Sequence, residues 1–201
     1  MKKSNVELMQ SARESLNEKW GLAIITFLIY QLIIGGMQAR EDMFPYTTII
    51  FLILAGPFSV GISIFTLNLS RNSEARFEQL FDGFKKNMGN SIIAYFLMVL
   101  FIILWTLLLI IPGIIAAISY SMIFFIIADD ETISPMDALD KSKKMMNGYK
   151  WKYFRLGLRL FGLALLCILT LGIGFLWLIP YAHVSCAKFY EDIKVKSIII
   201  E

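Results

Sequence analysis

The chain has 201 residues, of which 57% are apolar and only 17% charged, and this excludes an ordinary soluble domain. One histidine and two cysteines, with no CxxC spacing, argue against a metal site or a disulfide framework. The net charge of +3 comes without clustered stacking or base-reading residues, so it favours an anionic inner leaflet over a nucleic acid as partner.

The longest charge-free run lies between Lys86 and Asp129, with Pro112-Gly113 near its middle. A hydrocarbon core of about 30 Å needs roughly 20 apolar residues per helix, so this run predicts two spans joined by a turn. Applied to the whole chain, the same criterion predicts six spans, at residues 20–37, 48–69, 91–108, 110–128, 153–170 and 173–190. We therefore predict an all-α, six-span bundle that forms a single membrane domain over residues 1–201.

Basic residues are distributed very unevenly about these spans. Of the 19 Lys and Arg residues, only Arg40 falls on the side opposite to both termini. The positive-inside rule therefore predicts a multi-pass protein of the cytoplasmic membrane with both termini in the cytoplasm.

A polar segment with helical apolar spacing precedes spans one, three and five. Ser4 with Glu7, and Ser134 with Asp137, have the spacing of helix-capping pairs, and Ser73 opens the middle segment more weakly. We predict three cytosolic amphipathic helices, which lie in the headgroup layer or else pack on the ends of the spans. With the spans that follow them they predict a threefold internal repeat, with units 4–70, 73–128 and 134–192.

The second span of each unit begins near a proline and then carries small residues. Gly113, Ala117 and Ser121 are spaced four apart, as are Ser59 and Ser63. Small residues let helix backbones approach closely in lipid, so these positions predict helix-packing seams. Spans two, four and six should then form the inner layer.

Two stretches carry a resemblance to a known family. They run from Pro112-Gly113 through Ala128-Asp129-Asp130-Glu131, Ser134 to Ser142 and Gly148-Tyr149-Lys150, and from Ile179-Pro180-Tyr181 to Asp192. The chain resembles an uncharacterised family of bacterial integral membrane proteins, domain of unknown function 975. That family is distantly similar to the membrane domain attached to some glycerophosphodiester phosphodiesterases. The resemblance implies a six-span protein of the bacterial cytoplasmic membrane and no activity.

Three ligand candidates lie in or beside the predicted spans. His183 is in the middle of span six, where an ionisable residue suggests a proton relay or ligand contact; the alternative is a neutral ring bonded to a Ser or a carbonyl. Arg155 and Arg159 stand one turn apart at the start of span five. They could clamp a lipid phosphate, or simply snorkel to the interface.

Catalytic groups are not evident. The acidic residues Asp129, Asp130 and Glu131 suggest a solvated turn rather than a cation site, and the single His has no acid at membrane depth to pair with. We therefore expect no enzyme, cofactor or metal. The sequence favours a protein that binds lipid, or a membrane peptide or protein, in envelope homeostasis or in protection from or export of membrane-active peptides. The alternative is a small transporter or permease subunit.

Overall fold

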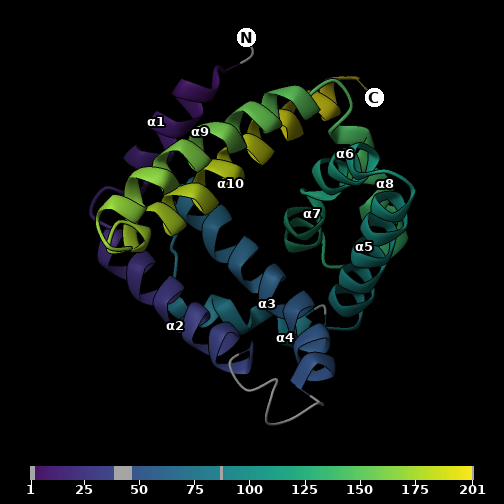
Figure 1. Cartoon of the computed structure of the whole chain (residues 1–201), viewed down its shortest axis with the longest axis horizontal. Helices are drawn as coiled ribbons and strands as arrows, with labels where there is room; N and C mark the ends of the chain where they lie inside the picture. The colour runs from purple at the N-terminus through teal and green to yellow at the C-terminus, as the bar shows by residue number, and fades with distance from the viewer. Residues whose placement is uncertain (1–2, 39–46, 87, 201) are drawn as a thin grey trace.

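The computed structural model describes residues 3–38, 47–86 and 88–200, with the side chains of all of these except residues 37–38, 47–49, 86 and 196–200. The predicted external loop with Arg40 lies outside the described residues. The described chain is all helical, as predicted, with ten α-helices, one short 3-10 helix and no strand (Figure 1). The elements are α1 (Asn5–Leu16), α2 (Trp20–Gln38), α3 (Thr47–Ser70), η1 (Phe77–Phe81), α4 (Asp82–Lys86), α5 (Met88–Leu108), α6 (Ile110–Tyr120), α7 (Ile123–Asp129), α8 (Pro135–Met145), α9 (Lys150–Leu169) and α10 (Phe175–Ile200).

Helices lie at each of the six predicted positions, the fourth divided into α6 and α7, but they do not all have the character of a span. Three segments are long and apolar enough to cross a membrane: Ile50–Ser70, Met88–Leu108 and Ile110–Asp129. A fourth results only if α1 and α2, which meet at 97°, are counted as one broken span. Basic residues extend far into α9, and charges return in the second half of α10. The apolar helices are thus compatible with membrane insertion, while six spans are not confirmed among the described residues.

Helix α3 crosses the middle of the molecule (Figure 1), and Gly61 on α3 and Gly83 on α4 let other backbones approach closely there. A Cβ on Gly61 would lie 2.0 Å from the Leu80 carbonyl oxygen, and one on Gly83 would lie 2.1 Å from that of Pro57. Elements η1 and α4 therefore pack along the middle of α3. The helix of this segment starts after Arg76 rather than at Ser73, where the sequence placed its opening.

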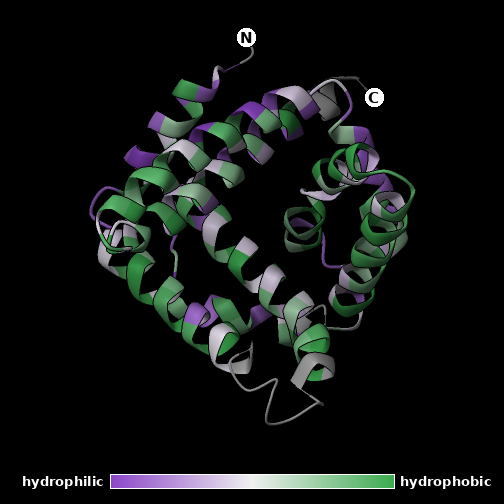
Figure 2. Ribbon diagram, in the orientation of Figure 1, coloured by the Kyte–Doolittle hydropathy of each residue, from purple (hydrophilic) through white to green (hydrophobic). Residues whose placement is uncertain are grey.

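The other two amphipathic helices begin where predicted. Ser4 and Glu7 form a complete capping box at α1, and the Ser134 hydroxyl accepts from the Asp137 N–H at α8. Of the two alternatives for their apolar stripes, packing against neighbouring helices is the one observed, since Leu16 and Leu139 are buried in the core. Figure 2 shows the polar face of α1 turned outward at the edge of the molecule.

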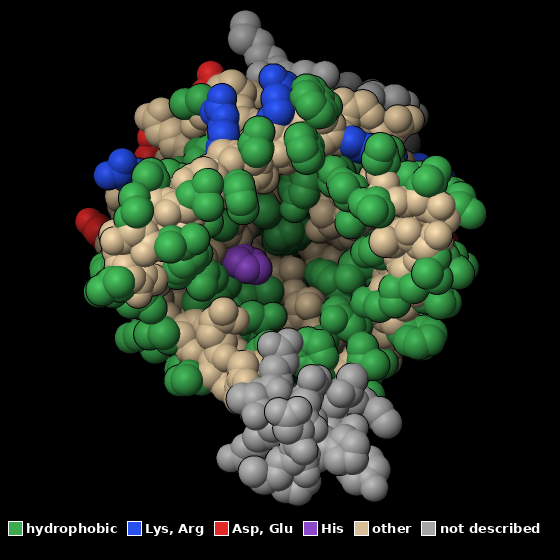
Figure 3. Space-filling model, in the orientation of Figure 1, with side chains coloured by type: hydrophobic (Ala, Val, Ile, Leu, Met, Phe, Trp, Pro, Cys, Tyr) green, Lys and Arg blue, Asp and Glu red, His purple; other side chains and the backbone are tan. Residues whose placement is uncertain are grey.

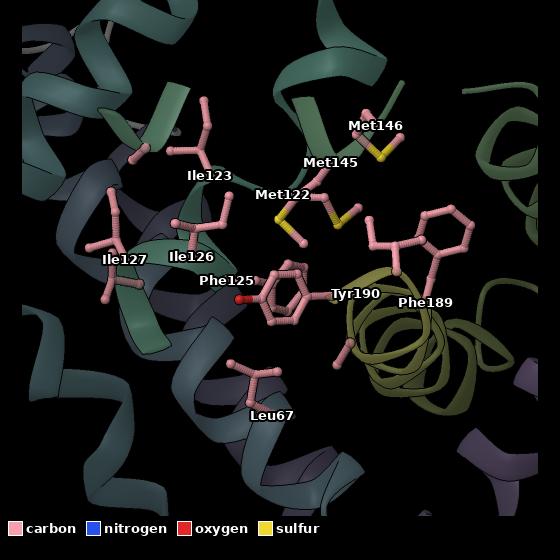
Figure 4. Packing of buried hydrophobic residues seen from close by; sticks show 14 of the residues in the cluster. Leu67, Met122, Ile123, Phe125, Ile126, Ile127, Met145, Met146, Phe189 and Tyr190 are labelled. Atoms are coloured by element: carbon pink, nitrogen blue, oxygen red, sulfur yellow. The ribbon is translucent and has the colours of Figure 1, made fainter. Parts of the chain in front are cut away.

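The main core joins α3, α7, α8 and α10. Leu67 of α3, Met122 just before α7, Ile126 of α7 and Met145 of α8 surround the stacked rings of Phe125 and Tyr190, whose centroids are 5.5 Å apart (Figure 4). Helices from predicted spans two, four and six thus meet, although α5 packs along α3 as well. The threefold repeat is not confirmed.

The predicted small-residue seam of α6 was wrong in register. Gly113 is buried and a Cβ there would lie 2.2 Å from Thr106 Oγ1, but Ala117 is exposed. The buried positions are Gly113, Ala116 and Ser119, spaced by three. Ser121 cannot continue the seam, because α6 ends at Tyr120 and Ser121 lies in the turn that follows.

In α3, Ser59 and Ser63 donate to carbonyls of their own helix, those of Ala55 and Ser59, both at 2.7 Å. Ser63 is buried and Ser59 is partly exposed. Both hydroxyls therefore donate within α3 and not to a neighbouring helix of the described chain.

Candidate functional site

Helix α1 is held along the hairpin of α9 and α10 by hydrogen bonds at its first residue and near its middle. The Asn5 side-chain amide donates to the Lys152 carbonyl at 2.9 Å, and the Tyr181 hydroxyl donates to the Met9 carbonyl at 3.1 Å. Leu8 and Ala12 are buried beneath α1. These contacts fix the orientation of α1, so that its exposed side borders α9.

A groove remains between α1, α9 and α10 on the outward side. It consists of two adjoining cavities of about 730 and 530 Å³, which share Arg13, Leu163 and Tyr181. The first is polar along α1 and receives Arg159 from α9. The second is mainly apolar and aromatic; its lining includes Trp20, Leu166, Trp177 and Leu178. One continuous groove therefore offers charge at one end and hydrocarbon at the other.

The cationic end of the groove is not neutralised by an ion pair. Arg13 and Arg159 are exposed, and neither has a carboxylate within 4.0 Å in the described part of the chain. Glu14 also lines the groove and accepts a hydrogen bond from Gln10 at 3.2 Å, so this end carries two guanidinium groups and one carboxylate. The arrangement suits a group that carries negative charge and an apolar tail.

The structure separates the two arginines that the sequence grouped together. Arg159 lines the groove, whereas Arg155 does not and remains exposed on α9. The second arginine at the groove is Arg13 of α1, which the sequence analysis did not identify as a candidate. Its position one turn after Met9, on the edge of the apolar stripe of α1, is the signal that could have found it.

His183 lies on another face, away from the groove lining. Its ring contacts Phe27 with centroids 4.8 Å apart, and it makes no hydrogen bond to the rest of the described chain. The bond to a Ser or carbonyl that its neutral interpretation anticipated is thus not seen. Figure 3 shows this histidine, the single one in the chain, at the edge of a hollow in an otherwise apolar face.

A second charged region, here called the hub, joins the ends of α3 and α7 to the second half of α10. The Asp129 carboxylate contacts the Arg71 guanidinium at 2.8 Å, the Lys194 ammonium at 2.6 Å and the Tyr190 hydroxyl at 2.8 Å. Glu191 pairs with Arg71 at 2.7 Å. Burial lowers the pKa of Arg71, but its bonds to Asp129 and Glu191 outweigh this and leave the pKa above its ordinary value.

The interpretation of Asp129 as part of a solvated acidic turn was therefore wrong. Its side chain is only 11% exposed, because α7 ends at this residue in contact with α3 and α10. Asp130 does face solvent, where bonds from the Thr132 hydroxyl and N–H hold its pKa below the ordinary value. No group of three or more potential metal ligands occurs among the residues that the structure describes.

The family comparison matches the chain over residues 1–119 and 106–197 to the family described as "Protein of unknown function (DUF975)". The chain belongs to this family. No curated protein and no solved structure matches it. The predicted membership is confirmed, whereas the expected similarity to glycerophosphodiester phosphodiesterases is not shown.

Membership in DUF975 supplies no activity, so the chemistry available to this member is that of its own side chains. The groove has unpaired arginines beside an apolar lining, whereas the hub has carboxylates already engaged by cations. Of the two regions, only the groove leaves charge and space for a ligand.

Proposed function

We propose that this DUF975 protein is a non-catalytic, multi-pass protein of the bacterial cytoplasmic membrane that binds an anionic lipid in the groove between α1, α9 and α10. The observation that carries the proposal is the placement of Arg13 and Arg159, without carboxylate partners, at one end of a groove whose other end is apolar. Holding such lipids would serve envelope homeostasis or a response to membrane-active peptides.

The chemistry of the groove fits a lipid phosphate better than a small soluble anion. Guanidinium groups bind phosphate oxygens through paired N–H donors, and they desolvate at lower cost than ammonium groups. Leu163, Leu166 and Trp177 would lie along an acyl chain. Each cavity has the size of a typical ligand pocket. A soluble anion would leave this apolar lining uncovered.

Lipid binding can be measured on the intact chain by native mass spectrometry in detergent, with phosphatidylglycerol or phosphatidylcholine added in turn. We expect preferential binding of phosphatidylglycerol. Arg13→Gln and Arg159→Gln should each weaken it about tenfold, the equivalent of one charge-assisted contact of roughly 1.4 kcal/mol. Arg155→Gln is the matched control, since this exposed arginine lies on the same helix outside the groove.

Three results would contradict the proposal. These are equal binding of the two lipids, an equal loss in the Arg155→Gln control, and turnover of a substrate by the reconstituted chain alone. Co-purification of a stoichiometric peptide in place of lipid would assign the groove to a different class of ligand.

Transport is the second candidate, and the observation that favours it is the position of His183 at the edge of the hollow in Figure 3. An ionisable side chain inside a membrane protein often marks a substrate or proton path. His183→Ala should then abolish a cellular phenotype while expression is unchanged. Under the lipid-binding proposal the same variant retains phosphatidylglycerol binding, because His183 does not line the groove.

A further inference from the structure

We propose that the hairpin of α9 and α10 is re-entrant: it enters the bilayer from the side on which its charged ends lie, and its tip, residues 169–174, ends among the acyl chains. The tip would then not reach water on the opposite side. This inference concerns the placement of the hairpin and does not depend on what the groove binds.

The first observation is length. On α9 the last charge is Arg159, and residues 160–169 extend about 15 Å at 1.5 Å per residue. On α10 the stretch from Phe175 to the first charge, Lys188, is about 20 Å long. A hydrocarbon core is about 30 Å thick, so both arms cover little more than one leaflet. Helix α5, by contrast, is free of charge over all 21 residues, about 31 Å, and is long enough to cross.

The second observation is the apolar surface of the tip. Leu171 is 94% exposed, Leu169 80% and Ile173 60%, and nothing in the described chain covers them. Leu171 also has a left-handed backbone, with φ of 53°. A turn in water usually places Gly or Asn at such a position, because other residues are strained there. A leucine at this point exposes apolar surface, which is unfavourable if the turn lies in water.

The third observation is that the tip satisfies its own backbone donors. Every N–H from residue 170 to residue 178 donates to an acceptor of the same hairpin. The Thr170 hydroxyl completes the set, since it donates to the Cys167 carbonyl at 2.7 Å and accepts from the Gly174 N–H at 3.0 Å. Helices in water end in similar caps, but there solvent can accept from any N–H group that the cap leaves free. In hydrocarbon a free N–H group is costly, and the turn must supply the acceptor itself.

These observations select acyl chains as what surrounds the tip. The tip carries no charge, and its N–H groups are already bonded within the hairpin, so it offers a polar partner only backbone carbonyls. The exposed apolar surface continues along α9 through Leu158, Phe161, Leu165 and Ile168. The tip is thus the end of a longer lipid-facing surface.

Depth measurements on the full chain in vesicles test the inference. Leu171→Cys, in a Cys167→Ser, Cys186→Ser background that retains its helix content, would carry a nitroxide spin label in vesicles of phosphatidylcholine and phosphatidylglycerol. Power saturation would compare collisions with oxygen and with a water-soluble nickel chelate. Ile173→Cys gives a second reading on the tip, and Ser73→Cys, in an exposed polar loop, is the aqueous control.

We expect frequent oxygen collisions at both tip positions, with nickel collisions roughly tenfold below those at the Ser73 control, because a polar complex is excluded from hydrocarbon. Nickel collisions close to the control value would place the tip in water and overturn the inference. Exclusion of both reagents would also overturn it, because the tip would then be covered by protein. Loss of lipid binding in the Arg159→Gln variant leaves these collision rates unchanged, so the two proposals fail separately.

Discussion

The hub and the groove are both charged, but their charges are satisfied in opposite ways. In the hub, Asp129 meets Arg71 and Lys194 within 2.8 Å, and Glu191 closes the network. In the groove, Arg13 and Arg159 have no carboxylate within 4.0 Å in the described chain. A charge at the edge of a low-dielectric region needs a partner. The hub finds its partners inside the fold, and the groove leaves that role to water or a ligand.

If ion pairs inside the fold stabilise it, breaking the most buried pair among the described residues should cause the largest loss of unfolding free energy. Lys152 and Asp192 approach to 2.7 Å, with side chains 12% and 7% exposed. Asp192→Asn removes the carboxylate that faces this ammonium group and should lower the free energy of unfolding by about 3 kcal/mol. Denaturant titration in detergent measures the loss.

The double variant Lys152→Met, Asp192→Leu provides the control for this pair. Replacing both charges by apolar groups removes the desolvation cost together with the attraction, so it should recover stability to within about 1 kcal/mol of the native chain. If the double variant is as unstable as Asp192→Asn, packing rather than charge dominates at this site.

A substitution in the hub should give the second-largest loss of unfolding free energy. Asp129→Asn leaves Arg71 and Lys194 without their shared carboxylate, and we expect a loss of about 2 kcal/mol, reduced from the fully buried case because both cations are about one-third exposed. The neighbouring Asp130→Asn is the matched control and should cost no more than about 0.5 kcal/mol. Similar losses at the two positions would remove the distinction between hub and solvated turn.

A substitution with a smaller effect can show whether the hub depends on the planar shape of Arg71 or only on its positive charge. Arg71→Lys keeps the positive charge but cannot hold Asp129 and Glu191 together through a planar group. It should cost about 1 kcal/mol of unfolding free energy, roughly the value of one lost hydrogen bond. The comparison Arg71→Gln should be clearly worse. Equal stability of Arg71→Lys and the native chain would show that charge alone suffices.

Local patterns in the sequence predicted the local structure well. The capping pairs at Ser4 and Ser134 place the starts of α1 and α8 correctly, because each uses atoms three residues apart. Apolar runs likewise place the long helices. Contacts between segments that are distant in the sequence could not be predicted from these local patterns. Nothing in the sequence near Leu80 shows that it packs on Gly61, because that contact depends on how the chain folds back on α3.

The same limit applies to the candidate site. Arg159 was found because a basic residue in an apolar helix is locally conspicuous. Arg13 was missed because it resembles any other charge on an amphipathic helix until α1 is placed on α9. Asp129 was misjudged for the corresponding reason, since its partners Arg71 and Lys194 come from distant parts of the chain.

The groove should give the smallest change in stability and a large change in binding. Arg13 and Arg159 are exposed and have no ion pair to lose, so the double variant Arg13→Gln, Arg159→Gln should unfold within about 0.5 kcal/mol of the native chain. Its phosphatidylglycerol binding should be lost. Raising the salt from about 0.05 M to about 0.5 M should weaken native binding, because the Debye length falls from more than 10 Å to less than 5 Å. The double variant should lose that dependence. A double variant that unfolds readily yet binds lipid as the native chain does would place these arginines with the charges that hold the fold together.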